Sequence, residues 1–193
     1  FYFIEPNPAF WSHIEEVLLK KFNGKLYKTA AGNSTGISDF YNFGMTSSFL
    51  QRQDYELKNK IKVNLDKLDN IISPNNLENT LLKIDVEGYE LNVIQGAKNL
   101  IKRDKPIILI ELELRILGNK KIKRIFNFFN KLNYNVYYTD NGKNFKSTNF
   151  NDLKNFQKNS YFKKDILLKR RLKKGEKRYY ISNFWFMPKN KNI

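Results

Sequence analysis

The sequence predicts an α/β fold with a mostly parallel sheet, and two observations favour it. Short apolar runs of strand length alternate along the chain with longer stretches whose apolar residues recur at helical spacing. Turn-forming pairs such as Asn23-Gly24 and Asn141-Gly142 separate these segments. The chain has 193 residues, which is enough for one domain with a hydrophobic core. We therefore expect a single domain over 1–193, with its core in 1–140 and a less regular basic part over 141–193.

The first half of the chain is expected to open with a strand, a loop and a helix. Phe1–Ile4 is an apolar run, and Pro6 and Pro8 prevent the strand from continuing. Ala9–Phe22 follows with the spacing of an amphipathic helix. Its predicted apolar face consists of Phe10, Ile14, Val17, Leu18 and Phe22. The next expected elements are a strand, a hairpin segment, a strand and a short helix, over Lys25–Ala31, Ile37–Phe43, Ile61–Leu65 and Asp66–Ile72.

The second half alternates strands and helices more regularly. Leu81–Val86 is the strongest strand pattern, and Glu87-Gly88 ends it. The elements expected after it are a helix, a strand, a helix and two strands, over Tyr89–Lys102, Ile107–Leu112, Lys120–Leu132, Asn135–Thr139 and Arg178–Met187. The pattern over Asn144–Lys174 fits both helix and loop and does not decide between them.

The composition excludes several kinds of chemistry. The chain has no Cys, which excludes disulfide scaffolds, thiolate zinc sites, iron–sulfur clusters and Cys nucleophiles. Its one His, His13, excludes multi-histidine metal sites, and its place away from the apolar face of the first helix favours a surface residue over a catalytic one. Trp11 and Trp185 are expected to be packing residues rather than ligand platforms. Any catalysis is therefore expected to use carboxylates.

The chain is strongly basic, with 35 Lys and Arg against 19 Asp and Glu and a net charge of +16. The segment Lys163–Arg178 is densely positive and flanked by aromatics, so one interpretation is a nucleic-acid-binding module. The alternative is a solvated basic face that reflects the codon usage of an AT-rich genome, and the lack of a nucleic-acid-binding motif favours it. The sequence has no apolar stretch of about 18 residues and no signal segment, so a cytoplasmic protein without a transmembrane segment is expected.

Glu5 stands at the end of the first predicted strand, where open α/β sheets bind their ligands. In nucleoside-binding sheets an acidic side chain at this place accepts hydrogen bonds from the two ribose hydroxyls. Glu5 is therefore a candidate cofactor-binding residue. A glycine-rich turn would lie about 20 residues before it, upstream of Phe1.

Three charged residues, Lys83, Asp85 and Glu87, share one side of the strongest strand pattern. A central parallel strand is normally apolar on both faces, and a buried charge needs a partner or a ligand. These residues are therefore candidates for a functional site. The alternative is an ion pair of Lys83 with Asp85 or with Glu87, where Glu87 also stabilises the start of the next helix.

Glu111 and Glu113 share one side near the end of the following strand. If that strand neighbours Leu81–Val86, Glu111 stands beside Asp85. Two such carboxylates can bind a divalent cation through oxygen ligands, or raise the pKa of one of them so that it acts as a general base. The alternative is that Glu113 is solvated and Glu111 caps a backbone group.

Two sequence motifs stand out, the string Leu-Lys-Ile-Asp-Val-Glu-Gly-Tyr-Glu over 82–90 and the string Phe-Ile-Glu-Pro-Asn-Pro over 3–8. Together they resemble motifs of the FkbM family of S-adenosylmethionine-dependent methyltransferases. Supporting pieces follow in the family's order, at Ala30-Ala31-Gly32-Asn33, Ser47-Ser48, Leu65-Asp66, Gly96-Ala97, Lys105-Pro106, Ile110-Glu111 and the closing segment 183–188. The resemblance covers Phe1 to about Tyr138, and the tail more loosely.

The resemblance implies a Rossmann-like class I methyltransferase fold. It also implies transfer of a methyl group from S-adenosylmethionine to a hydroxyl of a sugar, a polysaccharide or a related small molecule. The cofactor-binding residues that it implies are Glu5, Asn7, Ala31, Gly32 and Asn33. The residues that it places at the reacting centre are Lys83, Asp85, Glu87 and Glu111. Asp85 is favoured as the base or as a ligand of a divalent metal, with Glu111 as its partner, and the need for a metal is left open.

The sequence departs from the family at its start. Family members carry a first strand and a glycine-rich loop before the Glu-Pro motif, and neither precedes Phe1. In that fold the first strand lies between the strand that ends at Glu5 and the one that ends at Asp85. We therefore expect two unpaired strand edges, and a chain that is part of a longer protein. An inactive, methyltransferase-like interaction domain with weak or no cofactor binding is the remaining alternative.

Overall fold

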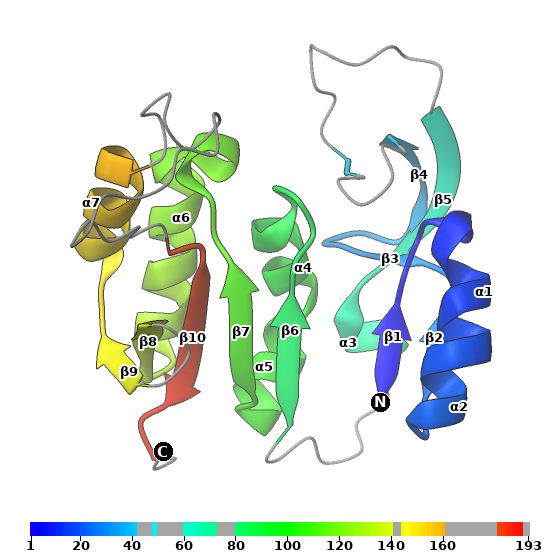
Figure 1. Ribbon diagram of the computed structural model, residues 1–193, viewed down its shortest axis with the longest axis horizontal. Helices are drawn as coiled ribbons and strands as arrows, with labels where there is room; N and C mark the ends of the chain where they lie inside the picture. The colour runs from blue at the N-terminus through cyan, green and yellow to red at the C-terminus, as the bar shows by residue number, and fades with distance from the viewer. Residues whose placement is uncertain (42–47, 50–59, 73–79, 141–143, 161–180, 191–193) are drawn as a thin grey trace, which may run out of the picture. The chain divides into compact units, whose positions relative to one another are not determined.

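The computed structural model describes residues 1–41, 48–49, 60–72, 80–140, 144–160 and 181–190. Helices and strands alternate along these residues, which confirms the predicted α/β class (Figure 1). The chain divides into two compact units. The first unit consists of Phe1–Glu78 and Val86–Lys105, and the second consists of Asn79–Asp85 and Pro106–Ile193. Ser47 and the basic segment Lys163–Arg178 lie outside the described residues.

The described strands of the first unit form two sheets. Strand β1 (Tyr2–Ile4) pairs in parallel with β2 (Lys25–Tyr27). In the other sheet, β5 (Lys60–Asp66) lies between β3 (Ala30–Ala31) and β4 (Gly36–Tyr41). Strand β3 is parallel to β5 and β4 is antiparallel to it. This second sheet packs its apolar face into a small core, which consists of Ala30, Phe40, Val63 and Leu65 with Phe49, Ile61 and Tyr89 against it.

The predicted first helix forms, but as a mixed helix. A 3₁₀ turn (η1, Pro8–Phe10) leads into α1 (Trp11–His13), a π-helical stretch (η2, Ile14–Leu18) and α2 (Leu19–Lys21). The predicted apolar face is only partly correct. Ile14 is buried, but Val17 is 48% exposed. The wider π turn rotates the following residues away from the direction that regular α-helical spacing predicts. His13 is exposed, as predicted.

The predicted helix over 89–102 is two helices, α4 (Glu90–Gly96) and α5 (Lys98–Asp104). Ala97 separates them with a non-helical backbone and is fully buried. The preceding short helix α3 (Leu68–Ile71) caps α5, because the Asp69 carboxylate accepts hydrogen bonds from the N–H groups of Asn99 and Leu100. Such a cap satisfies N–H groups at a helix start that have no partner within the helix.

The second unit contains one five-stranded sheet in the order β6-β7-β10-β8-β9. These strands span Leu81–Ile84 (β6), Ile107–Glu111 (β7), Asn183–Pro188 (β10), Tyr134–Asp140 (β8) and Asn144–Ser147 (β9). Only β6 and β7 are parallel among these described pairings, so the expected parallel character of the sheet is partial. The sequence predicts the closing strand but not its insertion between β7 and β8.

Two helices accompany this sheet. Helix α6 (Leu114–Lys131) is interrupted at Gly118, whose φ of 70° is unfavourable for residues with a side chain, and α7 (Phe150–Ser160) follows β9 (Figure 1). Helix α6 packs on β10 through ring contacts of Phe126 and Phe129 with Phe186. All three rings are buried, so aromatic contacts hold α6 on β10 within a core that also contains many Ile and Leu side chains.

Strands β1 and β6 each have one described partner strand. Strand β1 pairs with β2, and β6 pairs with β7, so the other edge of each strand has no partner within the described residues. Apolar side chains on both strands are exposed, at 58% for Tyr2 and 53% for Leu81. None of the described helices combines the length and the apolar character that a membrane crossing requires.

Candidate functional site

A pair of carboxylates lies at the carboxyl ends of the two parallel strands of the second unit. The register pairs Ile84 of β6 with Ile110 of β7, so Asp85 and Glu111 follow as neighbours. Their side chains are joined by a hydrogen bond. The predicted neighbourhood of Asp85 and Glu111 is therefore confirmed.

Lys83 supplies a positive charge to this pair. Its Nζ lies 2.6 Å from Oδ2 of Asp85, which is one of the two ion pairs left open by the sequence. The side chains are 56% and 37% exposed, so the expectation of a buried polar row is wrong. The physical reason is that β6 is an edge strand among the described residues, and its polar side chains reach solvent.

Ser182 contacts the carboxylate pair, and it was not predicted as a site residue. Its hydroxyl donates a hydrogen bond of 2.9 Å to Oε1 of Glu111, and Asn183 Nδ2 donates one of 3.3 Å to the Ser182 hydroxyl. The backbone N–H of Leu112 also donates to the Ser182 carbonyl at 2.7 Å. Ser182 reaches Glu111 because β10 runs antiparallel to β7 and starts where β7 ends. The sequence contains no local signal for this role of Ser182, because it follows only from the pairing of β10 with β7.

Gln157 of α7 links the end of β7 to the start of β10 by hydrogen bonds, and it was also not predicted. It is 4% exposed, and its Nε2 donates hydrogen bonds to the carbonyls of Leu112 and Ile181, at 2.6 and 2.8 Å. Its Oε1 accepts one of 2.6 Å from the N–H of Leu114. Leu112 follows Glu111 and Ile181 precedes Ser182, so one side chain fixes both ends of the Ser182–Glu111 hydrogen bond.

The two carboxyl groups differ in acidity. Burial, together with the hydrogen bond to Asp85, raises the pKa of Glu111 to about 7. Burial alone would also raise the pKa of Asp85, but hydrogen bonds from Lys83 and Glu111 outweigh it and lower that pKa below its usual value. The pair therefore shares one proton near neutral pH, with Asp85 ionised and Glu111 close to half protonated. A group that can gain or lose a proton at neutral pH suits general acid–base catalysis.

The other two predicted acids, Glu87 and Glu113, differ from their expected settings. Strand β6 ends at Ile84, and Glu87 lies in a turn of the first unit with a φ of 49°, so the strand alternation that grouped it with Asp85 does not extend to it. The Ser48 hydroxyl donates a hydrogen bond of 2.7 Å to the Glu87 carbonyl. Glu113 is not solvated as the alternative proposed. It forms an ion pair with Arg115, and its side chain is 15% exposed.

The first unit holds the predicted cofactor-binding residues. Oε1 of Glu5 accepts a hydrogen bond of 2.7 Å from the N–H of Asn7, and among the described residues no other group donates to this carboxylate. Burial raises the pKa of Glu5, although the Asn7 hydrogen bond opposes it. Trp11 Nε1 donates to the Glu5 carbonyl at 2.9 Å, so Trp11 holds this turn, consistent with the packing role predicted for it. The result is a half-buried carboxylate with an oxygen available to a ligand.

Asn7 supports the turn through its side chain. It is fully buried, and its Oδ1 accepts a hydrogen bond of 3.1 Å from the N–H of Ala9, which caps the 3₁₀ turn. Pro8 occupies the first position of that turn, where the missing N–H has no cost. The Glu-Pro-Asn-Pro string therefore encodes a rigid corner that presents Glu5.

The loop after β3 contains the remaining candidates, Ala31, Gly32 and Asn33. The N–H of Gly32 donates to the Asp66 carbonyl at 2.8 Å, and Asn33 Nδ2 donates to Gln95 Oε1 at 3.3 Å. Gly96 of α4 approaches this loop so closely that a Cβ there would lie 1.7 Å from the Gly32 carbonyl oxygen. The predicted Gly96-Ala97 pair thus serves the packing of α4 against the loop.

A polar cluster next to this loop was not predicted as a site. Oδ1 of Asp66 accepts hydrogen bonds from the Thr35 hydroxyl at 2.7 Å and from Asn70 Nδ2 at 2.8 Å. The Thr35 hydrogen bond, with smaller contributions from Asn70 and the Lys67 N–H, lowers the pKa of Asp66 despite some burial. Asp66 is therefore ionised at neutral pH, and its role in this structure is to fasten the loop after Gly32 to the end of β5.

The two candidate metal ligands, Asp85 and Glu111, would give a divalent cation two carboxyl groups at most. Within the described parts of the chain, no three side chains of His, Cys, Asp or Glu come together as metal ligands. Asp85 and Glu111 supply two carboxyl groups, one of which holds a proton near neutral pH. A divalent cation would have to take its other ligands from water or substrate.

One family model and one solved structure match this chain. The sequence model of the methyltransferase FkbM domain matches residues 1–136. The crystal structure of methyltransferase FkbM from Methylobacillus flagellatus KT is similar in fold, with a TM-score of 0.53 at 16% sequence identity. That comparison covers 96% of this chain and 36% of the other, so the chain spans about a third of the length of that protein. No curated protein sequence matches significantly.

Proposed function

Because the chain belongs to the FkbM methyltransferase family, we propose that it acts in the transfer of a methyl group from S-adenosylmethionine to a hydroxyl oxygen. The acceptor that we propose is a sugar, a polysaccharide or a related small molecule. The observation that carries the proposal is the Asp85–Glu111 pair, in which Glu111 has a pKa of about 7. S-Adenosylmethionine, when bound, supplies a methyl group on a positively charged sulfur.

Glu5 fits the ribose of such a cofactor. Its carboxylate is half-buried, and among the described residues only the Asn7 N–H donates to it. A carboxylate with a remaining acceptor oxygen can receive hydrogen bonds from a pair of ribose hydroxyls. The rigid corner formed by Pro6, Asn7 and Pro8 holds that oxygen in place before the ligand arrives.

Glu111 is proposed as the proton acceptor. In its ionised form the Glu111 carboxylate would remove the proton of the acceptor hydroxyl; the cofactor, when bound, would supply the methyl group to that oxygen and leave as a neutral thioether. The proton then resides on Glu111, where the hydrogen bond to the Asp85 carboxylate stabilises it. Lys83 keeps Asp85 ionised for this purpose. Ser182 and Asn183 orient the Glu111 side chain.

The charge of the chain favours an acidic acceptor over a basic one. The net charge is +16, and a positive protein attracts anionic substrates over distances of the order of the Debye length, about 8–10 Å at moderate salt. A glycan that carries carboxylate or phosphate groups has this character. The proposal therefore includes anionic glycans among the acceptors.

Calorimetric titration with S-adenosylmethionine tests the cofactor half of this proposal. We expect the protein, expressed with any native sequence that precedes Phe1, to bind the cofactor, and Glu5→Gln to weaken binding at least tenfold. The matched control is Glu15→Gln, since Glu15 is exposed and pairs only with Lys28 among the described residues. Unchanged affinity of Glu5→Gln would refute the ribose role, and no binding at all would refute the methyltransferase activity.

Transfer of a labelled methyl group tests the acceptor half. Labelled S-adenosylmethionine is incubated with a panel of neutral and acidic saccharides, and the products are analysed by mass spectrometry. We expect a gain of one methyl group on oxygen with wild type, and a loss of at least a hundredfold in rate with Glu111→Gln. Label found on nitrogen or carbon, or full activity of Glu111→Gln, would contradict the proposed reaction.

A further inference from the structure

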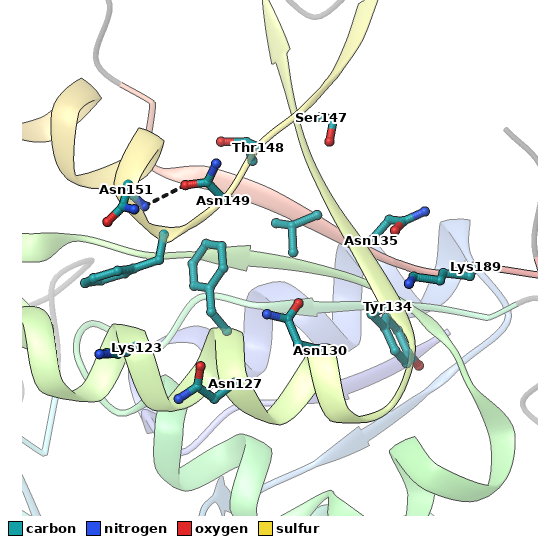
Figure 2. A pocket seen from close by; sticks show the side chains of 13 residues that line it. Lys123, Asn127, Asn130, Tyr134, Asn135, Ser147, Thr148, Asn149, Asn151 and Lys189 are labelled. Atoms are coloured by element: carbon teal, nitrogen blue, oxygen red, sulfur yellow. Dashed lines mark hydrogen bonds between the residues drawn. The ribbon is translucent and has the colours of Figure 1, made fainter.

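A polar cavity of about 450 Å³ lies in the second unit, away from the carboxylate pair (Figure 2). Helix α6 forms one wall, and the turn between β9 and α7 forms the opposite wall. The start of β8 and Lys189, which follows β10, close one end. This volume lies within the range of about 300–1,000 Å³ that is usual for sites of small ligands.

The walls present amides and hydroxyls to the cavity. On α6, Lys123, Asn127 and Asn130 are spaced so that they share one face of the helix, and Figure 2 shows them in a row below the β9–α7 turn. Thr148 and Asn149 lie across from them on that turn. A carboxamide both donates and accepts hydrogen bonds, so such walls suit a ligand with several hydroxyl groups.

The cavity carries positive charge without compensating acids. Lys123 and Lys189 are exposed, and neither forms an ion pair with any described residue. None of the described residues that line the cavity is acidic. The nearby Asp152 is engaged in the start of α7, where its Oδ2 accepts hydrogen bonds from the Asn149 N–H and the Thr148 hydroxyl. A ligand in this cavity would therefore meet two ammonium groups and no lining carboxylate.

The floor of the cavity is apolar. The rings of Phe126 and Phe150 line it and contact each other with centroids 6.1 Å apart. Phe126 also packs on the aromatic core of the unit, so this floor is rigid. The apolar C–H face of a sugar ring can stack on an aromatic floor while its hydroxyls reach the walls.

This cavity and the carboxylate pair lie at opposite ends of β10. Ser182 precedes the strand at the end where Asn183 pairs with Glu111, and Lys189 follows it at the end where Pro188 pairs with Tyr134. Seven residue steps of a strand span about 23 Å. The cavity is therefore a separate site.

We propose that this cavity binds a small polyhydroxylated anion of the sugar phosphate class. Lys123 and Lys189 lie at opposite ends of the cavity (Figure 2), so one of them would meet the phosphate, and the Asn side chains between them would meet the hydroxyls. The proposal depends on neither the cofactor nor the acceptor of the methyl transfer. Its failure and that of the proposed function are distinguishable, because its readout is binding alone.

Titration with glucose 6-phosphate, glucose and inorganic phosphate tests it, with backbone NMR shifts as the readout on the full chain. We expect saturable shifts at Asn127, Asn130 and Asn149 with glucose 6-phosphate, and at least tenfold weaker binding of both glucose and phosphate. The double variant Lys123→Gln, Lys189→Gln should weaken binding of glucose 6-phosphate at least tenfold. The matched control is the double variant Lys120→Gln, Lys131→Gln, which removes the same charge from exposed positions outside the cavity.

Several outcomes would overturn the proposal. Equal weakening in the control variant would mean that the general positive charge, and not this cavity, attracts the probe. If phosphate binds as tightly as glucose 6-phosphate, the cavity does not recognise the sugar. If glucose binds as tightly, the cavity does not recognise the phosphate group. Absence of saturable shifts up to about 10 mM probe would mean that the cavity takes no ligand of this class.

Discussion

The Ser182 hydroxyl donates a 2.9 Å hydrogen bond to the carboxylate of Glu111 and so joins the start of β10 to the end of β7. The two residues are far apart in the sequence, yet they act on one proton. Burial and Asp85 raise the pKa of Glu111, whereas the Ser182 hydroxyl lowers it, because a donor favours the ionised carboxylate. The balance leaves the pKa of Glu111 at about 7.

Removal of the Ser182 hydroxyl should move this pKa upward. We expect Ser182→Ala to raise the pKa of Glu111 by about half a unit to one unit, because one hydrogen bond to the ionised form is lost. Ser182→Thr retains a hydroxyl and should leave the pKa close to 7. The measurement is a ¹³C NMR titration of the Glu111 side-chain carboxyl carbon, assigned with Glu111→Gln. A lower pKa in Ser182→Ala would show that the hydroxyl does not stabilise the carboxylate.

Glu111 should also make stability depend on pH. Its pKa in the folded chain, about 7, lies above the ordinary 4.5, so the folded state binds its proton more tightly than the unfolded state. Stability should therefore fall as pH rises from 4.5 to 7 and should not change further above that window on account of this group. Glu111→Gln should remove this part of the pH dependence and stabilise the chain at pH 8, by about 1 kcal/mol after allowance for solvent screening.

Urea unfolding of wild type and Glu111→Gln at pH 5 and pH 8 measures this difference. Glu113→Gln is the matched control, because Glu113 pairs with Arg115 and should lose stability on substitution rather than gain it. A Glu111→Gln variant that is less stable than wild type at pH 8 would contradict the raised pKa.

Gly96 should not tolerate even one added methyl group. A Cβ at this position would lie 1.7 Å from the Gly32 carbonyl oxygen, which is backbone and cannot rotate away. We expect Gly96→Ala to reduce the free energy of unfolding by about 2–4 kcal/mol, since α4 must move away from the loop. Gln95→Ala, on an exposed neighbouring position of α4, should change it by less than about 1 kcal/mol. Thermal unfolding of both variants compares them, and equal stability would show that the helix and the loop shift without cost.

The sequence predicts most of the helices and strands, and it predicts that Asp85 and Glu111 are neighbours. It does not predict the residues of β10 and α7 that contact them. Strands such as β6 and β7 are short apolar runs, and their parallel orientation follows from the strand–helix–strand order, so the proximity of Asp85 and Glu111 at the carboxyl ends of the two strands was predictable. The insertion of β10 between β7 and β8 was not, because an antiparallel strand that returns from the end of the chain leaves no local signal. Ser182 and Gln157 depend on that insertion, so both escaped sequence analysis.

The other differences between prediction and structure occur where the backbone departs from regular strand or helix geometry. The sequence alternation places Glu87 on the same side of the strand as Asp85. In the structure Glu87 itself has a φ of 49°, which is not a strand conformation, so the alternation does not predict where its side chain points. The π-helical stretch after His13 similarly changes which residues of the first helix face inward. The break at Ala97 is of the same kind, since the close approach of Gly96 to the Gly32 loop is a tertiary constraint that helical periodicity does not contain.

Asp69 should stabilise α5 from outside that helix. Its carboxylate accepts hydrogen bonds from the N–H groups of Asn99 and Leu100, at 3.1 and 2.8 Å, and Ala97 at the start of the helix has no side chain that can do so. We expect Asp69→Ala to reduce the free energy of unfolding by about 1–2 kcal/mol, and Asp69→Asn by less than half of that, because Asn keeps one acceptor. Hydrogen exchange at the Leu100 amide gives the local readout. Protection of that amide in Asp69→Ala at the wild-type level would show that the cap contributes nothing.

Gln157→Glu should destabilise the corner that holds Glu111 and Ser182, and more so at high pH. The Gln157 side chain is buried and gives its two amide hydrogens to the carbonyls of Leu112 and Ile181. An ionised Glu has no hydrogen to donate and would face both carbonyl oxygens, whereas a protonated Glu can still donate to one of them. Burial would raise the pKa of this new carboxyl group, so stability should fall as pH rises from about 4 to that pKa. We expect a loss of about 2–4 kcal/mol at pH 8 and less at pH 5.

Asn155→Asp, on an exposed position of the same helix, should show almost no pH-dependent loss. Gln157→Leu should lose stability to a similar degree at both pH values, because it leaves the same backbone groups without partners but cannot ionise. Urea unfolding at the two pH values distinguishes these cases, and a Gln157→Glu variant with the same loss at pH 5 and pH 8 would show that this side chain is not buried against the two carbonyls.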